Sequence, residues 1–147
     1  MSPELYGEGE IPLLRLVPLV SRIIGISDKA KKYDITKSQL MFMTALYYRG
    51  LLSMTKISEF ISSSKEQATR AVAPLVDRGI VKRVEIPENR TRVYIELTED
   101  GKQIMDSLRD ECHHDVNERL KACLSDEEFS TLLDSVRTVI SLLNKVD

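Results

Sequence analysis

The segment from Met54 to Gly101 constrains the fold of this chain more than any other stretch. Its apolar spacing predicts a short helix, a turn of three serines, and a second helix that Gly79 ends. Two strands of a hairpin follow, and the second strand alternates apolar and polar residues. The predicted ranges are a helix to residue 61 capped by Thr55, a turn at 62–64, a helix to about 78, and strands at 82–86 and 93–97.

The order helix, turn, helix, hairpin predicts a winged helix-turn-helix, in which the second helix enters the major groove of DNA. A helical wheel separates an apolar side of this helix from a polar side. The apolar side should face the core and carries Ala68, Val72, Leu75 and Val76. The opposite side carries Ser63, Glu66, Gln67, Arg70 and Pro74. Pro74 should bend the helix while leaving its N-terminal half free to enter a groove.

The polar side offers groups suited to reading a duplex. Gln67 can form a two-bond contact with adenine, and Arg70 can do so with guanine. Phosphates are expected near the start of the helix, where its dipole favours anions. The predicted DNA-contacting residues are Ser63, Ser64, Lys65, Gln67, Thr69, Arg70, Arg90 and Arg92. The alternative is that this side is an ordinary solvated helix face.

The hairpin would form the wing. Arg90 and Arg92 lie at or just after its turn, where long side chains can reach a narrow minor groove. Glu88 could hold Arg90 by a salt bridge. The alternative is an exposed hairpin that carries charge only for solubility. The local charge favours the DNA interpretation, because residues 62–92 hold seven basic and four acidic residues within a chain of net charge -2.

Apolar stripes flank this central part on both sides. Residues 11–33 predict one helical stretch, in which Pro18 should cause a kink or delay the helix start. Thr36 should cap a helix at 37–48 that Gly50 ends. Thr98 should cap a long helix that carries Cys112 and Cys123, and a Ser125–Glu128 capping box should begin the last one. The last helix carries a heptad seam of Phe129, Leu132, Val136, Val139, Leu143 and Val146.

The heptad seam needs a partner, which predicts a homodimer. The alternative is packing against the N-terminal helix of the same chain. The predicted fold class is therefore mainly α with a small β-hairpin wing and dimerisation helices at both ends. The predicted organisation is one domain over 1–147, with a flexible arm at 1–10, dimerisation helices at 11–34 and 99–146, and the winged helix-turn-helix at 36–97.

Other chemistry has little support in the sequence. The two cysteines are too few for a disulfide scaffold or a zinc site, and both should be buried and inert. The alternative is that one of them senses oxidants, by oxidation or by a bridge across the dimer. No motif of an enzyme, a metal site or a cofactor site is present, and no apolar run is long enough to span a membrane. A cytoplasmic location is the expectation. Tyr47, Tyr48 and Arg49 either line a ligand pocket or form the edge of the core.

Several motifs resemble those of the multiple-antibiotic-resistance regulator (MarR) family. They are Ile57-Ser58-Glu59-Phe60, Gln67-Ala68-Thr69-Arg70, residues 75–83, Glu88-Asn89-Arg90 and Leu97-Thr98-Glu99-Asp100-Gly101. The chain departs from the family pattern at Pro74 and at Glu88, where the family usually has Asp.

The resemblance implies a dimeric transcriptional regulator, most often a repressor, that reads a pseudo-palindromic operator. Small, often aromatic or anionic ligands commonly release such regulators from double-stranded DNA. The alternative function is a winged-helix module that binds proteins instead of DNA. Glu66 favours this alternative, because a carboxylate on the groove-facing side would repel phosphate.

Overall fold

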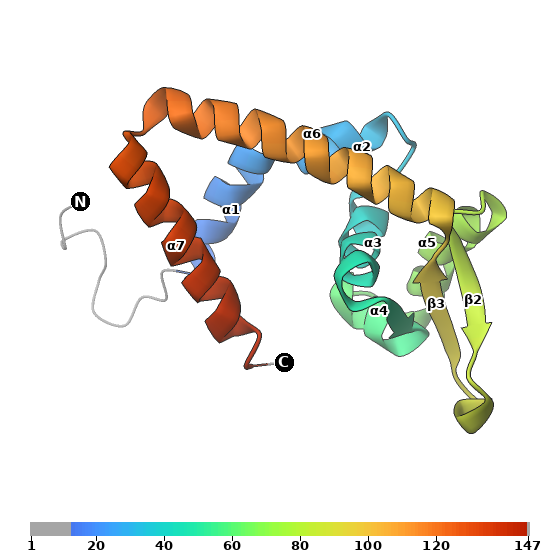
Figure 1. Cartoon of the computed structure of the whole chain (residues 1–147). Coiled ribbons are helices and arrows are strands. Elements are labelled where there is room, and N and C mark those ends of the chain that lie inside the picture. The colour runs from blue at the N-terminus through green and yellow to red at the C-terminus, as the bar shows by residue number, and fades with distance from the viewer. Residues whose placement is uncertain (1–12, 147) are drawn as a thin grey trace. The chain divides into compact units, whose positions relative to one another are not determined.

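The computed structural model describes residues 13–146 (Figure 1). The chain divides into two units, residues 1–110 and 111–147, and the long helix α6 (Glu99–Cys123) begins in the first and ends in the second. Helices dominate both units, and the first unit also contains a three-stranded sheet. This confirms the predicted fold class. The predicted flexible arm at 1–10 lies outside the described residues.

The N-terminal stretch is two helices, α1 (Leu13–Ile24) and α2 (Ile26–Lys31). The prediction of one continuous helix over 11–33 is therefore wrong. Gly25 separates the two helices with a φ of 59°, a left-handed conformation that glycine adopts without steric cost. Helix α1 begins before Pro18, so the proline does not delay the helix start.

Helix α3 (Lys37–Arg49) begins and ends as the sequence predicts. The Thr36 hydroxyl accepts a hydrogen bond from the Gln39 amide at 3.3 Å, and the Gln39 side chain accepts one from the Thr36 amide at 2.9 Å. Gly50 ends the helix with a φ of 83°. Capping residues act locally, which is why sequence alone locates this helix well.

The helix-turn-helix consists of α4 (Met54–Phe60) and α5 (Lys65–Asp77). Ser53 caps α4 by accepting from the Lys56 amide at 3.3 Å, so the predicted cap at Thr55 is wrong by two residues. Ser64 caps α5, and Gly79 follows it with a φ of 68°. The predicted inward side of α5 is confirmed, since Ala68, Val72 and Leu75 are buried and Val76 is half-buried.

The sheet has the order β1-β3-β2 and is antiparallel throughout. Its strands are β1 (Leu51–Ser53), β2 (Val81–Glu85) and β3 (Val93–Leu97). The short 3₁₀ helix η2 (Pro87–Asn89) forms the hairpin tip, which extends beyond α3, α4 and α5 in Figure 1. The sequence missed β1, because three residues directly after a helix are too few to show an alternating pattern.

The core of the first unit lies between α3, α4, α5, the sheet and the start of α6. Its largest fully buried side chains include Phe42, Met43, Leu46, Ile57, Leu75, Ile95 and Leu108. Within β3, Ile95 and Leu97 are buried as predicted. Val93 is 44% exposed instead, because it pairs with Glu85 beside the hairpin tip, away from the core.

The first turn of α6 is hydrogen-bonded to the residues directly before β2. The Thr98 hydroxyl donates to the Ile80 or the Gly79 carbonyl, at 3.0 and 2.5 Å, and accepts from the Gly101 amide at 3.1 Å. Thr98 therefore caps α6 as predicted. A Cβ on Gly101 would lie 2.1 Å from the Ile80 carbonyl oxygen, so only glycine permits this approach.

The second unit contains the end of α6 and helix α7 (Asp126–Leu143). The predicted capping box is confirmed, with the Ser125 amide donating to the Glu128 carboxylate at 2.9 Å. The helix ends at Leu143, so the predicted seam continues beyond it at Val146. Cys112 is buried as expected, but Cys123 is exposed at the end of α6, which corrects the prediction that both are buried.

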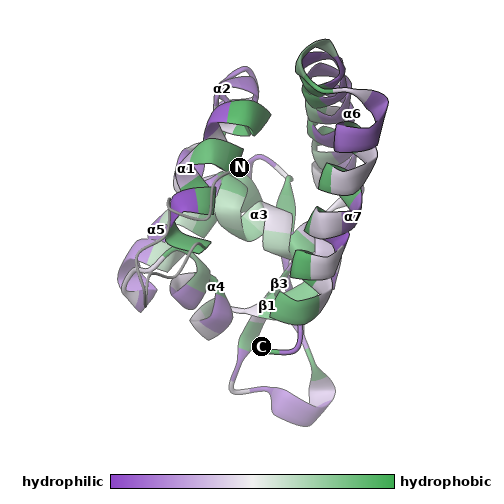
Figure 2. Cartoon of the chain, turned by 90° about the vertical axis from the view of Figure 1, so that its left-hand side faces the viewer, coloured by the Kyte–Doolittle hydropathy of each residue, from purple (hydrophilic) through white to green (hydrophobic). Residues whose placement is uncertain are grey.

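Neither α1 nor α7 has a buried residue. Both helices nevertheless carry many apolar side chains, and Figure 2 shows green, hydrophobic turns along each. On α1, Val17 is 64% exposed, and on α7, Val136 is 43% exposed. The exposed large apolar residues of the two helices are Leu13, Leu14, Leu16, Val17, Leu19, Val20, Leu132, Val136, Ile140, Leu142 and Leu143.

Candidate nucleic-acid interface

The N-terminus of α5 is held by a reciprocal capping box. The Ser64 hydroxyl accepts from the Gln67 amide at 3.2 Å, and the Gln67 side-chain oxygen accepts from the Ser64 amide at 3.2 Å. The box occupies the side-chain oxygen of Gln67. It leaves the side-chain NH₂ group available to a ligand. A two-bond contact between Gln67 and adenine therefore requires the cap to open.

The outer surface of α5 has the composition that the wheel predicts. Lys65, Gln67 and Arg70 are exposed, and so is Thr69, whose hydroxyl donates to the Lys65 carbonyl at 2.9 Å. Ser63 is half-buried, and its hydroxyl donates to the Ser64 carbonyl at 3.3 Å. The helix thus presents two cations and several hydroxyl groups around its positive end.

A cleft of about 340 Å³ separates α5 from the wing, and we call it the wing cleft. It brings together Lys65 and Thr69 of α5 with Arg92 of the wing, three of the residues predicted from the sequence. The rest of its lining is Ser53, Met54, Thr55, Glu66, Thr91 and Val93. Sequence reasoning missed Ser53, Thr55 and Thr91, because only the tertiary fold brings α4 and the wing beside α5.

Ser63, Ser64, Gln67, Arg70 and Arg90 do not line the wing cleft. They lie instead on the first turns of α5, on the turn before it, or at the hairpin tip. The predicted residues therefore divide into a group within the cleft and a group around it.

One acidic side chain lies within this basic surface. Hydrogen bonds from the Glu66 backbone amide and from the Ser64 hydroxyl lower the pKa of the Glu66 carboxyl, and Arg70 and Lys65 lower it further. Glu66 therefore carries a negative charge in the wing cleft at neutral pH. An anion that enters the cleft therefore meets this carboxylate, which repels it, as well as the cations of Lys65 and Arg92.

The hairpin tip is ordered by Asn89. The Thr91 hydroxyl donates to the Asn89 side-chain oxygen at 3.0 Å, and the Arg92 amide donates to the Asn89 carbonyl at 3.2 Å. Arg90 and Arg92 are both exposed. Within residues 13–146 no ion pair joins Glu88 to Arg90, so Asn89 shapes the tip in place of the predicted salt bridge.

A second cavity, of about 380 Å³, lies between the end of α3, the sheet and the start of α6; we call it the junction cavity. Tyr47 and Arg49 line it, which favours the ligand-pocket alternative for these two residues, whereas Tyr48 is not part of its lining. Leu46, Gly50, Leu51, Glu96, Leu97, Lys102 and Asp106 complete the lining.

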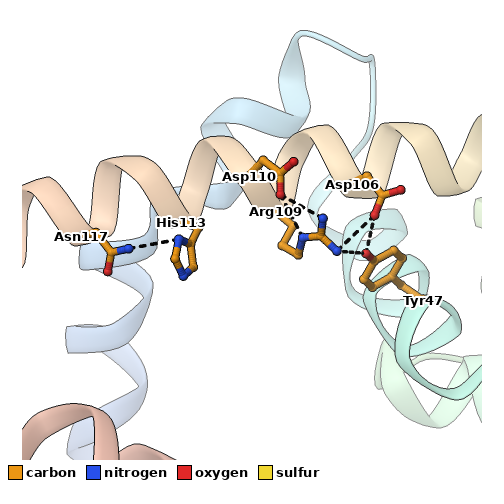
Figure 3. A network of polar contacts seen from close by, with 6 residues as sticks. All are labelled: Tyr47, Asp106, Arg109, Asp110, His113 and Asn117. Carbon is orange, nitrogen blue, oxygen red and sulfur yellow. Dashed lines mark hydrogen bonds and ion pairs between the residues drawn. The ribbon is translucent and has the colours of Figure 1, made fainter. Parts of the chain in front are cut away.

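Beside the junction cavity, a polar network joins α3 to α6 (Figure 3). The Tyr47 hydroxyl donates to the Asp106 carboxylate at 2.5 Å and accepts from the Arg109 guanidinium at 2.5 Å. Arg109 also contacts Asp106 at 3.2 Å and Asp110 at 2.9 Å. The hydrogen bond to Asp106 raises the pKa of Tyr47, so this hydroxyl keeps its proton.

Across residues 13–146, no three His, Cys, Asp or Glu side chains are grouped in a way that could hold a metal ion. His113 faces Asn117 one helical turn away, at 3.0 Å between the ring nitrogen and the amide nitrogen (Figure 3). None of the described helices is long and apolar enough to cross a membrane.

Three comparisons relate this geometry to known proteins. Residues 35–93 match the family model described as MarR family. The HTH-type transcriptional regulator YfiV of Bacillus subtilis is 31% identical over 129 residues, which cover 88% of this chain and 80% of YfiV.

Solved structures agree on the fold. Apo MarR from E. coli aligns with a TM-score of 0.71 and 23% identity over 88% of this chain and 97% of MarR. A mutant of that protein in complex with operator DNA aligns with a TM-score of 0.60 and 24% identity, over 88% and 94% of the two chains. NadR in complex with 4-hydroxyphenylacetate aligns at 0.63 and 20%, over 91% and 95%.

The helix-turn-helix, the three-stranded sheet with its wing and the long flanking helices define a winged-helix protein. The chain belongs to the MarR family of transcriptional regulators. Its relatives are regulators of transcription and not enzymes.

Proposed function

We propose that this protein is a homodimeric repressor that binds a pseudo-palindromic operator and leaves it when a small anionic or aromatic ligand binds. The site of action would be the cytoplasm, where the DNA is accessible. The observation that carries this proposal is the wing cleft. It places a cation of α5, a cation of the wing and four hydroxyl side chains around one space that an extended phosphate backbone can enter.

The predicted residues take separate roles in this proposal. Arg70 would read guanine, and Gln67 would read adenine once its side-chain oxygen leaves the capping box. Ser63, Ser64, Lys65 and Thr69 would contact phosphates and fix the register of α5 on the duplex. Arg90 and Arg92 would reach the minor groove. The MarR structure with operator DNA supports this proposal, because a protein of the same fold was solved in complex with operator DNA.

The dimer would form through the terminal helices, as the proposed division into dimerisation parts (11–34 and 99–146) and a DNA-binding part (36–97) requires. The support is the exposed apolar surface of α1 and α7, neither of which has a buried residue. Such faces are typical of helices that pack against another chain. Two-fold symmetry would then place two α5 helices about 34 Å apart, one turn of DNA.

The ligand would bind in the junction cavity. Among the described residues, Glu96 already pairs with Lys82 at 2.8 Å, and Asp106 bonds to Tyr47, whereas the side chain of Lys102 makes no ion pair or hydrogen bond. An anionic group could therefore pair with Lys102 while an aromatic ring packs near Leu46 and Leu97. The binding of 4-hydroxyphenylacetate by NadR supports this class of ligand.

The test begins with selection of binding sites from a random DNA pool, followed by affinity measurements across a range of salt concentrations. We expect the selected sequence to be palindromic. We also expect affinity to fall steeply with salt concentration, because phosphates neutralised by the protein release counterions. If the folded dimer enriches no sequence and its weak binding ignores salt, the proposal is wrong. The protein-interaction module, which the Glu66 carboxylate in the cleft favours, would then replace it.

A further inference from the structure

Among residues 13–146, Gln39 of α3 is the one polar side chain that is buried, with 6% of its surface exposed. Both ends of its amide group are engaged. The oxygen accepts from the Thr36 amide at 2.9 Å, and the nitrogen donates to the Ala71 carbonyl at 3.0 Å. The second bond links α3 to the middle of α5, two helices that lie against each other in the first unit.

The bond to Ala71 falls beside the weakest point of α5. Pro74 has no amide hydrogen, so it cannot donate to the carbonyl of Arg70, four residues earlier, and its ring crowds that turn. Ala71 supplies the next carbonyl along the helix. Gln39 therefore attaches α5 to the core at the point where the backbone hydrogen bonding of α5 is interrupted. This point separates the N-terminal half of α5, which carries Lys65 and Arg70, from the C-terminal half, which leads to β2.

The end of α5 is tied to the same region. Arg78, directly after the helix, donates to the Asp34 carbonyl at 3.0 Å and also to the Tyr33 carbonyl. Asp34 has a φ of 52°, so the turn before α3 turns its backbone carbonyls toward this guanidinium. Residues 33–39 thus hold α5 at two points, one beside the proline and one at the C-terminus.

We propose that Gln39 is a positioning residue for DNA recognition: through Ala71 it fixes the direction of the N-terminal half of α5 against the core. Discrimination between operator and unrelated DNA then depends on a side chain that never touches DNA. This inference rests on the proposed DNA-binding function. Without the tether, the first half of α5 can pivot at Pro74, and contacts to base edges suffer more than contacts to phosphates, which tolerate displacement.

The test compares Gln39→Glu with Thr36→Ala in the full-length protein. Gln39→Glu keeps the oxygen that accepts from the Thr36 amide but replaces the donor to Ala71 with a second acceptor. Thr36→Ala removes the cap hydroxyl and leaves the tether intact, so it is the matched control for a weakened α3. The readout is the ratio of affinities for the selected operator and a scrambled duplex, with oligomeric state and thermal midpoint measured in parallel.

Gln39→Glu should lower this ratio by about tenfold, as expected for one buried hydrogen bond, while Thr36→Ala leaves it unchanged. If Gln39→Glu does not fold, Gln39→Met takes its place, because it keeps the length and burial and lacks the donor. The Pro74→Ala background provides a second test. The alanine supplies an amide that can donate to the Arg70 carbonyl, so the interruption is removed and Gln39→Glu should change the ratio much less in that background.

An unchanged ratio for a folded Gln39 variant would overturn the inference. An equal loss in Thr36→Ala would overturn it too, because the effect would then come from weakening α3. If the wild-type protein shows no preference for any DNA, the proposed function is wrong. If the wild-type protein prefers its operator and the Gln39 variant does so equally well, only the inference about Gln39 is wrong.

Discussion

Among single residues, Gly101 shows how closely the start of α6 approaches the chain before β2. Gly101→Ala would place a Cβ 2.1 Å from the Ile80 carbonyl oxygen, and because this oxygen belongs to the backbone it has little room to shift. We expect a loss of about 1–3 kcal/mol or more in the free energy of unfolding. Urea denaturation measures it, with Gln103→Ala, at an exposed position of the same helix, as control. Helix propensity alone would make Ala more stabilising than Gly at this position. A variant that is more stable than the wild-type protein would therefore contradict this packing.

Two arginines of the proposed interface should differ in what they contribute. Arg70→Ala should lower the preference for the operator over other sequences by about 1–3 kcal/mol, because it removes a contact to a base edge. Arg90→Ala should weaken binding to all duplexes more evenly. Titration of operator and scrambled DNA with each variant measures the two effects. If Arg70→Ala left the preference intact, α5 would not be oriented as proposed.

At the scale of elements, the capping boxes of α3, α5 and α7 differ in their third helical residue. The first two use Gln39 and Gln67, whereas α7 uses Glu128. Hydrogen bonds from the Ser125 amide and hydroxyl lower the pKa of Glu128. A lowered folded-state pKa means that this cap is complete above the ordinary glutamate value of roughly 4.3 and is lost as the pH falls through the folded value.

We therefore expect the first turn of α7 to lose hydrogen-exchange protection in acid, after correction for intrinsic rates, while the first turns of α3 and α5 keep theirs. Glu128→Gln should preserve the cap and remove this pH dependence, because the amide oxygen still accepts from Ser125. Equal acid sensitivity in all three caps would show that unfolding of the whole chain, and not this carboxyl, is responsible.

The elements that sequence predicts best are those with local signals. Thr36, Ser64 and Ser125 each mark a helix start, because a cap and its helix lie within four residues of each other. The break at Gly25 was missed, since the apolar spacing continues across it. For the interface, the exposed face of α5 follows from helical periodicity, but the hydroxyls of Ser53 and Thr55 join it only through tertiary packing.

For the whole molecule, the exposed apolar surface of α7 should decide the oligomeric state. Val136→Asp places a charge within the proposed dimer interface, and we expect a folded monomer by sedimentation velocity. Affinity for a two-half-site operator should fall by roughly 100-fold or more, because the second half-site no longer binds within the same complex. Ser130→Asp, at an exposed polar position of α7, is the control. A stable dimer of Val136→Asp would place the interface elsewhere.

The unequal exposure of the two cysteines has a practical consequence. Cys112 is buried and Cys123 is exposed at the end of α6, so a maleimide probe should attach at one position of the unmodified sequence. In a homodimer, this places one label on each copy without any engineered residue. A pair of spin labels there would report the separation of the two α6 ends directly, and its change on adding operator or ligand would show whether the assembly rearranges.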